Sequence, residues 1–156
     1  MAAGAGPITD LIVETFRLNG TLLAAGDRLV ADIGLTSARW QVMGAIAMSA
    51  IPLSVAQTAR NMGLSRQAVQ RIANALSAED LVAFLPNPHH ARARLVVLTK
   101  KGNRTFETAI GRQRPWALTL ASGLSEREIT TAVTVLKAVR NRLEPPSAIE
   151  RTASWP

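Results

Sequence analysis

The stretch LSRQAVQRIANAL, from Leu64 to Leu76, decides the fold of this chain. Its apolar residues stand at positions 68, 69, 72, 73 and 76, which is the spacing of one buried stripe on a helix. The opposite face carries amide and guanidinium side chains and no carboxylate: Arg66, Gln67, Gln70, Arg71 and Asn74. Arginine can bond the edge of guanine in the major groove of DNA, and glutamine or asparagine can bond adenine. The stretch therefore predicts a helix that contacts bases and nearby phosphates through Arg66, Gln67, Gln70 and Arg71.

The residues before this helix predict a shorter helix and a tight turn. Ser54 and Gln57 have the spacing of a capping box, in which the two side chains satisfy N–H groups at the start of a helix. Gly63 can adopt the left-handed conformation that ends such a helix, and Ser65 is placed to cap the next one. Two helices joined by a glycine-containing turn form the helix-turn-helix pattern. In that pattern we expect Ser54 and Ser65 to donate hydrogen bonds to phosphates.

A β-hairpin is predicted directly after the second helix. Residues 81–85 and 95–98 are apolar, β-prone runs, and the loop between them is rich in proline and asparagine. Arg92 and Arg94 lie near the tip of this hairpin. The hairpin would therefore act as a wing whose arginines touch the DNA backbone or enter the minor groove.

Three stretches resemble the MarR family of bacterial transcriptional regulators: GLTSARW at 34–40, the 65–76 helix followed by EDLV at 79–82, and RARLVVLTKKG at 92–102. The resemblance covers roughly residues 10–143, and its strongest part is the wing with its Leu-Thr-x-x-Gly exit. The family wing usually carries an Asp two residues before the tip arginine and uses it to orient that arginine. Here Arg92 matches the arginine and His90 stands at the Asp position, as a polar residue of the wing loop near phosphates.

The resemblance also implies how the chain is assembled and regulated. It implies a homodimer whose end helices interlock, and a crevice between the long helices and the winged region that holds a small aromatic or phenolic ligand. Phe16, Trp40, Met43 and Trp116 are the candidate lining of such a crevice. All four are also good core residues, and we favour the core interpretation by roughly two to one because aromatic side chains are only a weak indicator of a pocket.

Composition and charge agree with a partner that is a polyanion. The 156 residues suit one compact domain, and 47% of them are hydrophobic, as in a globular protein. The net charge is +7, from 18 Lys and Arg against 11 Asp and Glu. Between positions 52 and 101 the only acidic residues are Glu79 and Asp80, so the basic excess lies on the predicted winged region. Such an excess attracts nucleic acid, although without sequence preference.

Several function classes are excluded or disfavoured. The chain has no cysteine, which excludes disulfides and thiolate chemistry. No apolar run reaches the length of a membrane span, and residues 1–7 lack the basic and apolar regions of a signal peptide, so we expect a cytoplasmic protein. His89 and His90 are adjacent and no third histidine exists, so no metal site is predicted. We find no catalytic constellation and no cofactor motif, and we expect no enzyme.

The chain ends predict a second, all-helical region. An apolar stripe runs from Ile8 to Ile33, and a long helix capped by Thr99 should run to about Ser122. Pro115 lies inside that helix and predicts either a bend or a division into two helices. Ser125 to Glu128 is a second capping box, which opens a final helix to about Leu143. These helices have more apolar surface than one winged domain can cover, which favours a symmetric dimer.

The predicted fold is mainly α with a small β-hairpin wing. We expect a flexible N-terminus at 1–7, a helical dimerisation region at 8–33 and 100–144, a winged helix-turn-helix at 34–99, and a C-terminal tail at 145–156 in which Trp155 could dock on a neighbour. The leading hypothesis is a homodimeric transcriptional regulator that binds a pseudo-palindromic operator in double-stranded DNA. We expect it to be a repressor that leaves the DNA when a small ligand binds. The alternatives are a winged-helix module that binds another protein, and a small-molecule binding protein or enzyme that uses the Trp40 crevice, although we find no catalytic group for the enzyme.

Overall fold

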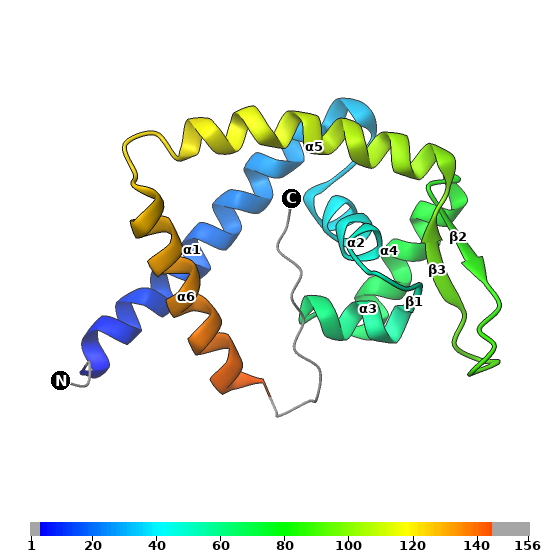
Figure 1. Cartoon of the computed structure of the whole chain (residues 1–156), viewed down its shortest axis with the longest axis horizontal. Helices are drawn as coiled ribbons and strands as arrows, with labels where there is room; N and C mark the ends of the chain where they lie inside the picture. Colours follow the sequence, from blue (N-terminus) through cyan, green and yellow to red (C-terminus); the bar gives the residue numbers. More distant parts are fainter. Residues whose placement is uncertain (1–3, 145–156) are drawn as a thin grey trace.

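The computed structural model describes residues 4–144. The predicted tail at 145–156, with the docking of Trp155, and the first three residues lie outside the described residues. The described chain is mainly helical with one small antiparallel sheet, as predicted (Figure 1). None of its helices within residues 4–144 has the length and hydropathy of a membrane span.

The winged helix-turn-helix occupies the middle of the chain. Its helices are α2 (Ser37–Ala47), α3 (Val55–Met62) and α4 (Arg66–Ala78). Its strands are β1 (Leu53–Ser54), β2 (Val82–Leu85) and β3 (Leu95–Leu98). The sheet order is β1-β3-β2, so the predicted hairpin of β2 and β3 is confirmed and the two-residue strand β1 is an addition that the sequence did not indicate.

The local signals that defined the two central helices act as predicted. The Ser54 hydroxyl accepts from the N–H of Gln57 at 3.3 Å, and the Gln57 side chain accepts from the N–H of Ser54 at 2.8 Å. Gly63 ends α3 with a φ of 65°, in the left-handed region. Ser65 caps α4 by accepting from the N–H of Ala68 at 3.1 Å. Together these caps set both ends of α3 and the start of α4.

One hydrophobic core holds the three helices against the sheet. Val69, Ala73 and Leu76 supply the buried face of α4. Trp40 and Met43 come from α2, and Met43 is fully buried. Burying a side chain of this size stabilises the fold by about 1.5–3 kcal/mol. The core interpretation of Trp40 and Met43 is therefore what the structure favours.

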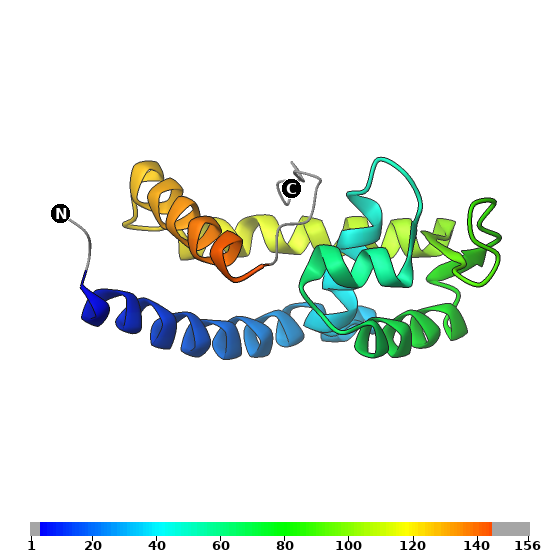
Figure 2. The same ribbon diagram turned by 90° about the horizontal axis from the view of Figure 1, so that it is seen from below.

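The two chain ends form long helices that extend away from the winged unit (Figures 1 and 2). They are α1 (Ala5–Val30), which continues into the 3-10 turn η1 (Ala31–Ile33), α5 (Lys100–Leu120) and α6 (Glu126–Leu143). Two details differ from prediction. Helix α1 begins three residues before the predicted start, because a proline at position 7 is tolerated in a first turn, where the N–H has no helical partner. Helix α5 continues through Pro115 as one helix, so the division into two helices was wrong.

An ion pair fastens α5 to the junction between α1 and α2. The guanidinium of Arg112 forms two hydrogen bonds with the Asp32 carboxylate, one of them from Nη2 to Oδ2 at 2.8 Å. The same guanidinium donates to the carbonyl oxygen of Leu29 at 3.2 Å. Both contacts join residues about 80 positions apart in the chain. They join α5 to the C-terminal end of α1 and to η1.

The Asp32→Asn variant should show a pH-dependent loss of stability. The hydrogen bonds from Arg112 hold the pKa of the Asp32 carboxyl below its ordinary value. The ionised form is therefore favoured in the folded protein, and its contribution is present above the unfolded pKa of about 4 and disappears as pH falls through the lower folded pKa. Urea unfolding should show Asp32→Asn less stable than the parent at about pH 7, with the difference shrinking below about pH 4.

Asp10→Asn is the matched control for this measurement. Asp10 is an exposed carboxylate on α1 that takes part in none of the salt bridges among residues 4–144. An equal loss in both variants would show that the pairing with Arg112 is not the cause.

Candidate nucleic-acid interface

Helix α4 presents a polar face that is largely exposed. Its predicted contact residues Arg66, Gln67 and Arg71 are exposed, and Gln70 is half-buried. Because Val69, Ala73 and Leu76 anchor the opposite face in the core, the polar face is held outward on a rigid support. A helix held in this way can enter a groove of a large partner such as a nucleic acid.

One hydrogen bond orders the polar face. The side-chain nitrogen Nε2 of Gln70 donates to Oδ1 of Asn74 at 2.9 Å. The two residues are four apart, so they lie on one ridge of the helix together with Arg66. The ridge therefore presents a guanidinium at its start and a paired set of amides behind it.

The wing lies beside this ridge and carries two arginines. The guanidinium of Arg94 stacks over the ring of Phe84, with its carbon 4.7 Å from the ring centre. Cation–π contacts of this kind stabilise exposed arginines by about 0.5–1 kcal/mol. Arg94 is thus supported on Phe84 of β2, the edge strand that leads into the wing.

The wing loop is closed by an amide. Asn87 Nδ2 donates to the carbonyl oxygen of Ala93 at 2.8 Å, and Asn87 Oδ1 accepts from the N–H of His89 at 3.0 Å. The N–H of His90 donates to the carbonyl oxygen of Asn87 at 3.2 Å. Asn87 therefore ties the two sides of the loop together just before Arg94, and His90 lies exposed at its tip.

The ridge of α4 and the wing enclose a hollow of about 150 Å³. Its wall combines charged, amide and aromatic groups from both sides: Ser54, Val55, Ala56, Arg66, Gln70, Asn74, Phe84, Arg92, Ala93 and Arg94. Three arginines and no carboxylate line it. The structure thus brings together Arg66 and Gln70 from the helix with Arg92 and Arg94 from the wing, four of the residues that were predicted to contact DNA.

The charge of this hollow is not neutralised by nearby acids. Within residues 4–144, Arg66, Arg92 and Arg94 take part in none of the salt bridges. Glu79, one of the two acidic residues of the winged region, is engaged elsewhere, because its carboxylate pairs with Arg39 at 2.7 Å. The hollow therefore remains a site for an anion, such as a phosphate, with hydrogen-bonding amides beside it.

The other predicted residues take different places. Gln67 and Arg71 are exposed on the neighbouring ridge and lie outside the hollow. Ser54 borders the hollow but is largely buried as the cap of α3, whereas Ser65 is exposed at the start of α4. Five residues that line the hollow were not in the predicted contact set: Val55, Ala56, Asn74, Phe84 and Ala93. The four-residue spacing from Gln70 was a signal for Asn74, but no sequence pattern pairs Phe84 with Arg94.

The four candidate residues for a small-ligand crevice differ in their exposure to solvent. Trp40 and Met43 are core residues. Phe16 is 73% exposed on α1, and Trp116 is half-buried on α5. Only these last two are open to a ligand from solvent.

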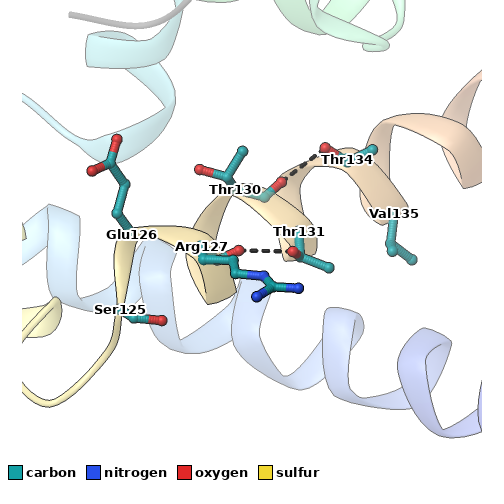
Figure 3. Close-up of a pocket in the computed structure, with 7 residues that line it drawn as sticks. All are labelled: Ser125, Glu126, Arg127, Thr130, Thr131, Thr134 and Val135. Atoms are coloured by element: carbon teal, nitrogen blue, oxygen red, sulfur yellow. Dashed lines mark hydrogen bonds between the residues drawn. The ribbon is translucent and has the colours of Figure 1, made fainter.

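A larger hollow of about 690 Å³ lies along α6 and is drawn in Figure 3. All seven lining residues belong to α6 or its cap, so no second element closes it. Two of its three threonine hydroxyls already donate to the backbone of α6: Thr131 to the carbonyl oxygen of Arg127 at 2.7 Å, and Thr134 to that of Thr130 at 2.8 Å (Figure 3). We assign no small-molecule site to this surface.

Comparison with known proteins agrees with this geometry. The model of the MarR family matches residues 33–93, which contain the whole helix-turn-helix and most of the wing. An uncharacterized protein of Mycobacterium tuberculosis is 39% identical over 100 residues, covering 64% of this chain and 68% of that one. The transcriptional activatory protein BadR of Rhodopseudomonas palustris is 30% identical over 99 residues, covering 62% of this chain and 57% of that one.

Solved structures share the fold. The transcriptional regulator MOSR of Mycobacterium tuberculosis, solved in complex with DNA, superposes with a TM-score of 0.71 at 19% identity, covering 86% of this chain and 98% of that one. The likeness therefore includes the long end helices as well as the winged unit.

Proposed function

This chain belongs to the MarR family of winged-helix transcription regulators, and from that premise we propose that it acts as a homodimer on a pseudo-palindromic operator in double-stranded DNA. Members of this family regulate transcription and are not enzymes. The observation that carries the proposal is the hollow between α4 and the wing, where three arginines and two amides gather with no carboxylate.

The hollow supports a division of labour on DNA. Arg66 and Gln70 lie on a helix, which is the element that fits the major groove and reads base edges there. Arg92 and Arg94 lie on the wing, where they would meet the backbone or the minor groove. Phosphate contacts position a protein on the duplex, whereas base contacts select the sequence. We therefore assign positioning to the wing arginines and sequence selection to the α4 ridge.

The long helices support a dimer. Every residue of α6 is exposed except Val139, which is half-buried, although an apolar stripe runs along the helix. Leu118 on α5 is 69% exposed, and Ile12 on α1 is 42% exposed. Apolar side chains left exposed along several helices favour an interaction surface in this part of the protein. A second copy is the occupant we propose, because two-fold symmetry would also place two α4 helices on successive turns of DNA.

Repression and its release by a small aromatic or phenolic compound complete the proposal. Phe16 and Trp116 are the aromatic side chains that such a compound could reach, since Trp40 and Met43 are in the core. Titration of the operator complex with salicylate, as a simple phenolic probe, should lower DNA affinity in the parent more than in a Trp116→Ala variant.

Selection from random duplexes at two salt concentrations tests the DNA-binding proposal. We expect enrichment of a pseudo-palindrome with half-sites about 10 base pairs apart, because each subunit reads one half-site per helical turn. Affinity should fall steeply as salt rises, because phosphate contacts release counterions. Enrichment of a single half-site would contradict the dimer, and absence of binding would favour the protein-interaction alternative.

A further inference from the structure

We propose that Asn74 sets the base preference of Gln70, so that Gln70 selects adenine and rejects guanine. This inference rests on the proposed DNA-binding function. It assigns a role to Asn74, which was not among the predicted contact residues. It starts from the hydrogen bond in which Nε2 of Gln70 donates to Oδ1 of Asn74 at 2.9 Å.

The position of the pair allows such a role. Both side chains line the hollow between α4 and the wing, so both lie at the surface that would meet DNA. Arg66 lies one turn earlier on the same ridge and is itself a donor suited to guanine. Gln70 is therefore the member of the ridge whose preference between the two purines is open, and its amide orientation decides that preference.

Counting hydrogens shows what the pairing does. A glutamine amide has two N–H donors on Nε2 and one carbonyl acceptor. Asn74 takes one of the donors, which leaves Gln70 one N–H and its Oε1. In the major groove, adenine presents one acceptor, N7, and one donor, the N6 amino group. The paired amide therefore matches adenine with both of its remaining groups.

Guanine presents two acceptors, N7 and O6. A free glutamine amide can turn both Nε2 hydrogens toward them, but the paired amide has only one hydrogen left and places Oε1 opposite O6. An oxygen facing an oxygen leaves both lone pairs without a donor, which is costly when the interface excludes water. Asn74 is thus a positioning residue that acts through Gln70. By accepting one Gln70 hydrogen, it makes the contact with guanine unfavourable.

The alternative role for this pair is purely structural. Hydrogen bonds between glutamine and asparagine four residues apart also stabilise isolated helices. A structural role would change helix stability and total DNA affinity, but it would leave the ratio of affinities for adenine and guanine unchanged. That ratio is the readout that separates the two roles.

The experiment starts from the operator obtained by selection with the parent protein. Gln70→Ala identifies the position that Gln70 reads, as the base pair at which preference is lost. Affinities for duplexes carrying adenine or guanine at that position are then measured for the parent, Asn74→Ala and Asn74→Asp. We expect the parent to prefer adenine by about tenfold, within the range of one bidentate base contact, and Asn74→Ala to prefer it by only about twofold.

Asn74→Asp keeps an acceptor oxygen at the same place and should retain the tenfold ratio, although its negative charge weakens binding to both duplexes. Alanine is the best helix former, so Asn74→Ala should fold, and a thermal melt verifies this. An unchanged ratio in Asn74→Ala, or equal losses on both duplexes, would overturn the inference while the proposed function stands. A parent protein that selects no sequence would overturn both.

Discussion

Gly102→Ala should lower the free energy of unfolding by about 3 kcal/mol, the upper range for an overpacked site. Gly102 lies in the first turn of α5 and is buried. A methyl group added to it would overlap the carbonyl oxygen of Leu81 and crowd the carbonyl carbon and Cα of the same residue. The neighbour is backbone and not a flexible side chain, so it cannot turn away. Thermal unfolding at fixed protein concentration should show a fall of roughly 6–12 °C in Tm.

The backbone at Leu81 is held from several sides. Its carbonyl oxygen already accepts from the N–H of Thr99 at 3.1 Å, and the Thr99 hydroxyl donates to the carbonyl oxygen of Asp80 at 2.6 Å. Lys101 adds a hydrogen bond from its ammonium group to the carbonyl oxygen of Glu79 at 2.8 Å. The start of α5 is thus fastened to the turn between α4 and β2, and relief of the overlap would break these bonds.

Gly111→Ala is the matched control, since it makes the same change in the same helix. An added methyl group at Gly111 meets nothing within 4 Å. This variant should gain about 0.5–1 kcal/mol, because alanine has the higher helix propensity. Equal stability of the two variants would mean that α5 does not approach Leu81 as closely as described.

Local signals explain most of the agreement between sequence and structure. The caps at Ser54, Ser65 and Thr99 act between residues three apart, and Gly63 requires only a left-handed backbone. Such features are encoded by near neighbours, so periodicity and capping rules recover them. The position of the α4 ridge on the protein surface follows from the same rules, because its apolar stripe determines which face turns outward.

The features that escaped prediction depend on residues far apart in the chain. The Arg112–Asp32 ion pair spans 80 positions, and the approach of Gly102 to Leu81 depends on how α5 docks. Strand β1 has two residues, too few for a pattern, and exists because β3 offers it a partner. The continuity of α5 through Pro115 also depends on the surrounding structure, since the helix propensity of proline alone disfavours it.

The candidate interface depends both on local sequence signals and on contacts between residues far apart in the chain. The helix half of the hollow could be read directly from the spacing of Arg66 and Gln70. The wing half could be located only as a loop with two arginines, and the stacking of Arg94 on Phe84 needed the three-dimensional structure. This difference matters for function, because a guanidinium supported on a ring loses less conformational freedom on binding than one on a free loop.

Replacing both wing arginines, Arg92→Ala with Arg94→Ala, should weaken operator binding by about a thousandfold at about 0.1 M monovalent salt. In a dimer the double replacement removes four guanidinium groups. Each phosphate contact contributes about 0.9 to the slope of log K against log salt, so the slope should become shallower by about three to four. Filter binding or fluorescence anisotropy across a salt series measures both quantities in one experiment.

The control removes the same charge from another place. Arg17 and Arg28 are exposed residues of α1, so their double replacement by alanine changes the net charge equally without touching the hollow. If long-range charge alone attracted DNA, both double variants would lose affinity alike. If the wing arginines contact phosphates, only their loss should change the slope, and the loss should be similar on operator and random duplexes. A wing variant that keeps the parent's slope but loses sequence preference would reverse our assignment, because reading would then belong to the wing and positioning to α4.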